Sequence, residues 1–149
     1  VSPLAGQVKP LSQATDPVFS SGVMGQGVVI EPSQGELVSP VNGTVTVLFP
    51  TKHAVGIVSE EGVEMLMHIG MDTVSLDGKG FVAHVEQGDK VVVGQQLISF
   101  DMDVIKKAGL VTETPVIITN QDDFQADVEG DLPRDIKRGD ALMIAHRIK

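Results

Sequence analysis

Two of the four histidines stand at the ends of neighbouring apolar segments, where an imidazole could do chemistry. His53 opens the segment HAVGIVS and His68 closes the segment VEMLMHI, with the turn-like sequence SEEG at 59–62 between them. A neutral imidazole is a good nucleophile and metal ligand near neutral pH, because its ordinary pKa is about 6.5. Two imidazoles on one face could therefore hold one small group between them. His84 and His146 are expected to face outward from strands and to have structural roles only.

The register of a hairpin between these two segments decides whether the histidines meet. If Val58 lies opposite Val63, His53 lies directly opposite His68, and side chains so placed share a face with Cβ atoms about 4.5–5.5 Å apart. If the loop instead has three residues and ends in a bulged Gly62, strand alternation puts the two histidines on opposite faces. The apolar pattern mildly favours the second register, and the local sequence leaves both open. The residues that the second register gathers on one face are Val55, Ile57, Met65 and Met67.

Short apolar runs bounded by turn residues predict the elements that must position these histidines. Runs rich in Val and Ile alternate with Gly, Pro, Asn and Asp, which is typical of strands. The turn signals recur roughly every 8–12 residues, as in β-sandwiches and barrels. Asn42-Gly43 predicts a hairpin turn, because this pair tolerates positive φ. The fold class predicted is all-β, an antiparallel sandwich or barrel.

One short helix and a modest internal repetition complete this prediction. The segment 101–110 is expected to be helical, capped by Asp101 or Asp103 and ended by Gly109. The stretches 87–100 and 137–146 share a Gly-Asp turn before an apolar strand, and 39–45 opens a strand in a similar way. No linker or low-complexity tract divides the chain, so residues 1–149 are predicted to form a single domain.

Composition excludes several classes of function. The net charge of −9 argues against nucleic-acid binding, which requires Lys and Arg for the phosphates. The absence of cysteine excludes disulfides and thiolate zinc sites. No apolar run reaches the ~18–20 residues of a membrane span, and the opening VSPLAGQVKP does not resemble a signal peptide. These features are compatible with a cytoplasmic location without direct membrane insertion, which is the location expected.

Five fragments, in order along the chain, together resemble one known family. That family is the glucose-type enzyme IIA domain of the bacterial phosphoenolpyruvate-dependent sugar phosphotransferase system (PTS), and the resemblance covers essentially the whole chain. The fragments are SPLAGQVKPLSQATDPVFSSGVMGQGVVIEP (2–32), TKHAVGI (51–57), VEMLMHIGMDTVSLDGKGF (63–81), QGDKVVVGQQLISFD (87–101) and TETPVIITN (112–120).

This resemblance implies a fold and a role for the histidines. The family fold is a compact antiparallel β-sandwich of the duplicated hybrid, or barrel-sandwich, type, with one or two short helices. By resemblance, His68 is the phosphoryl acceptor, His53 stabilises the phosphoryl group, and Thr51 orients the histidine pair through its hydroxyl. Asp72 is expected beside the site in an orienting or partner-facing role. The second ring nitrogen of His68 is expected to donate to a backbone carbonyl near Gly70.

The resemblance also implies protein partners. A histidine-containing phosphocarrier protein would phosphorylate His68, which would pass the group to a cysteine of the cognate enzyme IIB during sugar uptake. No cofactor is expected beyond the covalent phosphate on His68. Regulatory targets, and a place within a membrane-anchored transporter, are compatible with this role. The docking face expected around the histidines comprises Val18, Phe19, Val23, Met24, Phe49, Leu66, Ile69 and Met71, whereas Met65 and Met67 are expected in the core.

Two other functions remain open at this point. The segments SPVNGTV and EQGDKVVVGQQL resemble turns of biotinyl- or lipoyl-type carrier domains, although the modified-lysine tripeptides Met-Lys-Met and Asp-Lys-Ala do not occur. A metal-dependent hydrolase could use His53, His68 and Asp72 as zinc ligands. A metal bridging only the two histidines is a further possibility. The sequence does not identify the sugar.

Overall fold

The computed structural model of the chain describes residues 1–14, 17–22, 25–70, 73–128, 130 and 133–148. Short antiparallel strands dominate these residues, which confirms the predicted antiparallel β-sandwich with short helices. The strands are β1 (Gly6–Pro10), β2 (Gln26–Pro32), β3 (Glu36–Val38), β4 (Gly43–Leu48), β5 (Ala54–Ser59), β6 (Glu64–His68), β7 (Phe81–Ala83), β8 (Lys90–Val91), β9 (Gln96–Phe100), β10 (Thr114–Ile118), β11 (Phe124–Val128), β12 (Arg134–Ile136) and β13 (Met143–Arg147). The helical elements are η1 (Leu11–Gln13), α1 (Pro17–Ser20), η2 (Thr73–Leu76) and α2 (Met102–Lys107).

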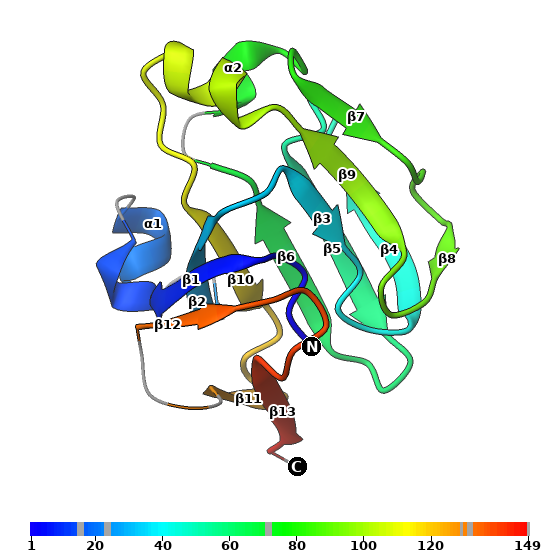
Figure 1. Cartoon of the computed structure of the whole chain (residues 1–149). Helices are drawn as coiled ribbons and strands as arrows, with labels where there is room; N and C mark the ends of the chain where they lie inside the picture. The colour runs from blue at the N-terminus through cyan, green and yellow to red at the C-terminus, as the bar shows by residue number, and fades with distance from the viewer. Residues whose placement is uncertain (15–16, 23–24, 71–72, 129, 131–132, 149) are drawn as a thin grey trace.

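The large sheet is built from two matching halves. Its eight strands follow the order β12-β1-β2-β10-β6-β5-β4-β8. The halves meet where β10 pairs with β6, with Val116 opposite Met67. Outward from this pair, β2 matches β5, β1 matches β4, and β12 matches β8. In Figure 1, β5, β4 and β8 lie to the right of β10 and β6, whereas β2, β1 and β12 are labelled to their left and β1 and β12 run partly in front of β10.

The two halves agree in backbone detail as well as in strand order. Gly6 of β1 and Gly43 of β4 occupy matching places, and at each of them a neighbouring strand approaches closely. A Cβ on Gly6 would lie 2.1 Å from the backbone oxygen of Glu31, and a Cβ on Gly43 would lie 2.1 Å from that of Val58. Only glycine fits such an approach, so the same constraint has been met twice in one sheet.

The chain leading into β1 and β4 repeats too. The sequences VSPLAGQV (1–8) and VSPVNGTV (38–45) share five of eight residues in register. Ser2 Oγ and Ser39 Oγ each donate to the carbonyl oxygen two residues ahead, at 2.7 and 2.6 Å. The backbone oxygens of these serines accept from Gly139 and Gly94, at 3.0 and 2.9 Å. The turn at Gly139 therefore matches the turn at Gly94, and not the earlier Gly-Asp turn at 88–89 that the sequence had paired with it.

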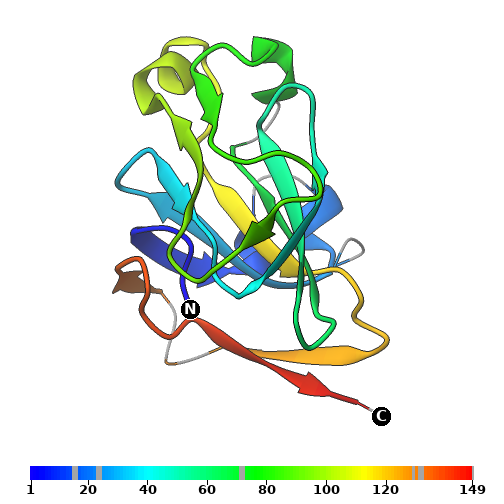
Figure 2. The same cartoon turned by 90° about the vertical axis from the view of Figure 1, so that its right-hand side faces the viewer.

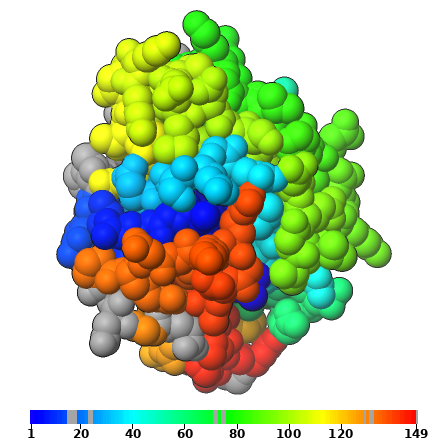
Figure 3. Space-filling model, viewed as in Figure 1, coloured from blue at the N-terminus to red at the C-terminus, as the bar shows by residue number. Residues whose placement is uncertain are grey.

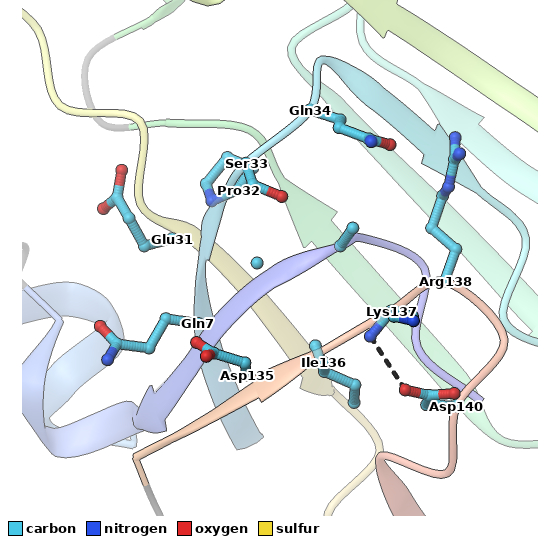
Figure 4. A pocket seen from close by; sticks show the side chains of 12 residues that line it. Gln7, Glu31, Pro32, Ser33, Gln34, Asp135, Ile136, Lys137, Arg138 and Asp140 are labelled. Carbon is cyan, nitrogen blue, oxygen red and sulfur yellow. Dashed lines mark hydrogen bonds between the residues drawn. The ribbon is translucent and has the colours of Figure 1, made fainter.

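Each half of the large sheet carries a surface hollow, and the one over Gly6 is shown in Figure 4. A hollow of about 890 Å³ lies over Gly6, and a smaller one of about 320 Å³ lies over Gly43 in the other half. In Figure 3 this face shows blue β1 between the cyan residues after β2 and the orange residues around β12. The hollow over Gly6 is lined by Ala5, Gly6, Gln7, Glu31, Pro32, Ser33, Gln34, Asp135, Ile136, Lys137, Arg138 and Asp140, and so by neither site histidine.

The main core joins the large sheet to the smaller sheet β3-β9-β7. Leu37 and Ile98 from the small sheet share one buried cluster with Ile57 and Met67 from the large sheet, and none of the four is more than 1% exposed. The ribbon formed by β11 and β13 lies across one end of the molecule (Figure 2) and adds Phe124 to the same cluster. Aliphatic side chains thus supply most of the core, as the scarcity of aromatic residues requires.

A second, smaller cluster lies on the other face of the large sheet. Val29 of β2 and Ile117 of β10 are covered there by Leu11, Ala14 and Phe19, which belong to the segment containing η1 and α1. Leu66 of β6 packs against the edge of this cluster and is only partly buried. The segment with η1 and α1 therefore covers one half of this face and ends beside β6.

The remaining sequence predictions have mixed outcomes. Helix α2 forms where expected, with Asp101 as the N-cap accepting from the backbone N–H groups of residues 103 and 104, although it ends at Lys107. The hairpin expected at Asn42-Gly43 is wrong, because β3 pairs with β9 while β4 pairs with β5 and β8. The Asn-Gly pair instead carries the chain from one sheet to the other. His84 and His146 are exposed, as expected. No helix in the described part of the chain is long and apolar enough to cross a bilayer.

We expect Gly43→Ala to lower the free energy of unfolding by about 3 kcal/mol, the upper end of the usual cost of overpacking. The added Cβ meets backbone rather than a movable side chain. Gly94→Ala is the matched control, because Gly94 has φ 87° with no atom within 4 Å of the added carbon. Its cost should be only the about 1–2 kcal/mol of a left-handed conformation. Urea unfolding followed by circular dichroism measures both, and equal losses would contradict the close-approach argument.

Candidate functional site

Four aromatic rings stand in a row at one end of β5 and β6. The ring row consists of Phe19, His68, His53 and Phe49, with successive centroids 5.2, 4.9 and 5.3 Å apart. The two imidazoles form the middle of the row and meet edge to face, with an angle of 80° between their planes. Two of the chain's five phenylalanines therefore flank the histidine pair. The structure brings together the two histidines that the sequence singled out.

His68 is the last residue of β6 and points to the outer face of the sheet. Along β6 the side chains of Met65 and Met67 enter the main core, whereas those of Leu66 and His68 alternate to the other side. The Nδ1 atom of His68 lies 2.8 Å from the carbonyl oxygen of Gly70. A carbonyl can only accept, so Nδ1 carries a proton and, in the neutral ring, Nε2 carries the nucleophilic lone pair. The carbonyl expected near Gly70 is confirmed.

His53 lies in a tight turn just before β5. The N–H of Lys52 donates to the carbonyl of Phe49 at 2.7 Å, and Lys52 itself has φ 62°. The Oγ1 atom of Thr51 lies 2.5 Å from Nδ1 of His53, as the orienting role of this threonine requires. The carbonyl of His53 accepts from the N–H of Ile69 at 2.7 Å, which ties the turn to the end of β6. The ring of His53 is thus held by Thr51, and its backbone by Ile69.

The observed register is the one that the apolar pattern favoured, but its expected consequence is wrong. Ala54 pairs with His68 and Val55 pairs with Met67, after a loop in which Gly62 has φ 96°. Strand alternation would then place His53 on the face opposite His68. Residue 53 does not belong to the strand, however, because β5 begins at Ala54, so strand alternation does not fix the direction of its side chain.

Burial sets the protonation state of His53. Its side chain is only 3% exposed. This burial, together with the neighbouring His68, lowers the pKa of His53 from 6.5 to about 4. The ring is therefore neutral at neutral pH and offers one N–H donor and one lone pair rather than a positive charge.

The expected docking face is present only in part among the described residues. Phe19 and Phe49 lie against the two histidines, and Leu66 lies half-buried on the same face. Ile69 is a correction, because it is 0% exposed within the main core and cannot contact a partner. Four other predicted residues lie outside the described residues, and only the backbone of Val18 is described. These four are Asp72, Val23, Met24 and Met71.

Thr73 is a residue near the site that the sequence analysis did not single out. It is 0% exposed, and its Oγ1 donates to the carbonyl oxygen of Ile69 at 2.5 Å. Gly70, whose carbonyl holds His68, has φ 71° and lies directly beside the Thr73 methyl group. The sequence pointed to Thr73 only through its spacing, because it lies three residues after Gly70 and five after His68.

The described residues contain no group of three or more His, Cys, Asp or Glu side chains that could hold a metal ion. The zinc site considered from the sequence needed Asp72 as its third ligand, and Asp72 lies outside the described part of the chain. Within the described part, the site consists of two imidazoles, one hydroxyl and one backbone carbonyl.

The low pKa of His53 makes the stability of the protein depend on pH. Between about pH 6.5 and about pH 4 the unfolded chain binds a proton at residue 53 and the folded chain does not, so stability should fall as the pH falls through this window. His53→Gln should remove this contribution, which urea unfolding at a series of pH values measures against wild type. His84→Gln, at an exposed position, should keep the wild-type dependence. A His53 ring signal that titrates near 6.5 in NMR would refute the burial argument.

Comparison with known proteins identifies the family of the chain. The family model described as "phosphoenolpyruvate-dependent sugar phosphotransferase system, EIIA 1" matches residues 1–124. The chain is 57% identical over 123 residues to the "PTS system beta-glucoside-specific EIIBCA component" of Bacillus subtilis (strain 168), a match that covers 83% of this chain. The match spans only 20% of that relative's length.

A solved structure shows the same architecture. Glucose permease IIA from Mycoplasma capricolum matches with a TM-score of 0.84 and 36% sequence identity, over 95% of this chain and 91% of that chain. The family model matches more than half of the chain and includes both site histidines within its range. The chain therefore belongs to the EIIA 1 family of the phosphoenolpyruvate-dependent sugar phosphotransferase system.

Proposed function

We propose that His68 accepts a phosphoryl group from a phosphohistidine of the small phosphocarrier protein and passes it to a cysteine of the cognate enzyme IIB. The observation that carries this proposal is the histidine pair, in which each Nδ1 is bound to an oxygen of the protein. The chemistry of each ring is thereby directed to its Nε2. Members of the EIIA family are components of a phosphotransferase system. The proposal identifies Nε2 of His68 as the atom that carries the phosphoryl group.

Each transfer exchanges one bond to phosphorus for another. In the first, the P–N bond of the donor phosphohistidine breaks as a bond forms between phosphorus and Nε2 of His68. In the second, that P–N bond breaks as the cysteine thiolate of enzyme IIB forms a P–S bond. No water or nucleotide enters either step. Such transfers need positioning and stabilisation of charge more than covalent assistance, and the Gly70 carbonyl supplies the positioning of His68.

His53 is placed to stabilise the phosphoryl oxygens. If the Thr51 hydroxyl donates to Nδ1 of the neutral His53 ring, the ring proton resides on Nε2. With the two rings 4.9 Å apart, this N–H can reach an oxygen of a phosphoryl group carried by His68. A fixed donor of this kind acts on the charge that develops during transfer.

Phe19 and Phe49 limit the access of water to the pair. Each lies against one imidazole, and Phe19 is only 6% exposed. An apolar flank of this kind disfavours hydrolysis of a phosphohistidine while leaving its outer side to a protein partner. Together with the half-buried Leu66, these rings are the described part of the proposed docking face for the phosphocarrier and enzyme IIB.

The comparisons also bear on the alternatives and on the sugar. The family assignment favours the phosphoryl relay over a biotinyl- or lipoyl-type carrier domain. The relative from Bacillus subtilis is described as specific for beta-glucosides and combines components B, C and A in one name. We therefore propose a β-glucoside as the transported sugar and an enzyme IIB of that specificity as the acceptor.

His68→Ala should abolish phosphorylation by phosphoenolpyruvate, enzyme I and the phosphocarrier, because the accepting nitrogen is lost. In wild type the adduct should be one phosphate that is labile in acid and stable in base, as a phosphohistidine is. Intact mass and radiolabelling measure the adduct. His84→Ala should label like wild type, since His84 is exposed and bonds to Ser99 rather than to the pair. Label on the His68→Ala variant would refute the assignment.

His53→Gln should still accept phosphate but pass it to enzyme IIB about 10²–10³-fold more slowly, the usual effect of losing one donor to a developing oxyanion. Acceptance should persist because His68 and its bond to Gly70 remain in place. Single-turnover transfer from the phosphorylated variant to the isolated enzyme IIB measures the second step. Transfer at the wild-type rate would show that His53 is not the stabilising donor.

A further inference from the structure

We propose that Thr73 is a positioning residue for His68, acting through the backbone at Ile69 and Gly70. This inference rests on the proposed function, in which Nε2 of His68 accepts the phosphoryl group. The Nδ1–H of His68 donates to the backbone oxygen of Gly70. Whatever fixes the Gly70 peptide therefore also fixes the tautomer and the direction of the imidazole.

Thr73 contacts this peptide with both groups of its side chain. Its hydroxyl donates to the carbonyl of Ile69, the residue directly before Gly70, at 2.5 Å. Its methyl carbon would lie only 2.6 Å from a Cβ built on Gly70, so the methyl group packs against the glycine's α-carbon. On another side, the carbonyl oxygen of Val111 would lie 2.9 Å from the same Cβ. Gly70 is thus held between the Thr73 side chain and the chain that leads into β10.

The conformation of Gly70 explains why it needs such support. Gly70 has φ 71°, which lies in the left-handed region. Glycine has more backbone conformations available than any other residue, so neighbouring groups must hold it in this one. A strand could not hold it, because β6 ends at His68. Thr73 is completely buried. Its side chain gives this part of the backbone a hydrogen bond at Ile69 and a methyl contact at Gly70.

The segment 73–78, which begins with the residue that contacts Gly70, also runs close to the turn that precedes His53. Thr73 begins η2, and the turn after η2 brings Gly78 to Thr51, where a Cβ on Gly78 would lie 3.7 Å from the carbonyl oxygen of Thr51. The segment that begins at Thr73 therefore also passes close to the backbone of Thr51.

The test compares two substitutions that each remove one of the two contacts. Thr73→Val keeps a methyl group against Gly70 but removes the hydroxyl from Ile69, and Thr73→Ser does the reverse. For each variant, the ring ¹⁵N chemical shifts of His68 report which nitrogen carries the proton, and exchange of the Nδ1 proton reports its hydrogen bond. The rate of phosphoryl acceptance from the phosphocarrier is measured on the same samples.

Thr73→Val should give ¹⁵N shifts of mixed tautomers, faster exchange of the Nδ1 proton, and acceptance about two- to tenfold slower, the effect of one ordinary hydrogen bond. Thr73→Ser should keep the Nδ1–H tautomer and most of the rate. Ser39→Ala is the matched control: it also removes a buried hydroxyl bound to a carbonyl, but in the chain between β3 and β4. It should lower thermal stability without changing the signals of His68.

Wild-type ¹⁵N shifts and acceptance rate in Thr73→Val would overturn the positioning role, even if the melting temperature fell. Loss of the Nδ1–H signature in Ser39→Ala to the same extent would also overturn it, since the effect would then follow general destabilisation. A wild-type protein that takes no phosphate at His68 would instead refute the proposed function. In that case the ring ¹⁵N shifts would still decide whether Thr73 positions the imidazole.

Discussion

Each site histidine is bound through Nδ1 to an oxygen two residues away in the chain. For His53 that oxygen is the hydroxyl of Thr51, two residues before it, and for His68 it is the carbonyl of Gly70, two residues after it. Each link crosses or includes a left-handed residue, Lys52 with φ 62° and Gly70 with φ 71°. Local turns therefore set the orientation of each imidazole, and the long-range structure has only to bring the two turns together. The pairing of β5 with β6 does this, and the hydrogen bond from the N–H of Ile69 to the carbonyl of His53 extends that pairing to the two turns.

The duplicated fold contains, in its other half, a position that matches the histidine site. By strand register, the residues that match Ala54 and His68 in the other half are Gly27 and Ile117, which pair in the same way. Ile117 is buried under Leu11 and Phe19, whereas His68 is half-buried. The segment with η1 and α1 thus covers one of two equivalent positions and ends with its phenylalanine against the imidazole at the other. Of the two matching positions on the outer face of the sheet, the segment with η1 and α1 buries Ile117 and leaves His68 partly accessible.

The sequence predicted the strands, helix α2 and the Gly70 carbonyl, because turn residues, caps and apolar runs act locally. It failed where a residue left the expected alternation. His53 was assigned to a strand, since nothing in the type of Lys52 announces a positive φ. Asn42-Gly43 was read as a hairpin, although the pairing of β4 is decided by β5 and β8 across the sheet. Thr73 was missed because its importance depends on what its side chain touches, which spacing alone does not show.

A buried, neutral His53 suits a group that must arrive and leave again. A charged donor forms hydrogen bonds about twice as strong as a neutral one, and would stabilise the phosphorylated protein as well as the transition states. Such uniform stabilisation would leave the barrier to onward transfer unchanged and so would not speed it. A phosphoryl group raises the pKa of a nearby imidazole by opposite charge. Because the pKa of His53 starts at about 4, it would have to rise by about three units before half of the rings were protonated at neutral pH. Burial of His53 therefore favours a donor that stays neutral while the phosphoryl group is in transit.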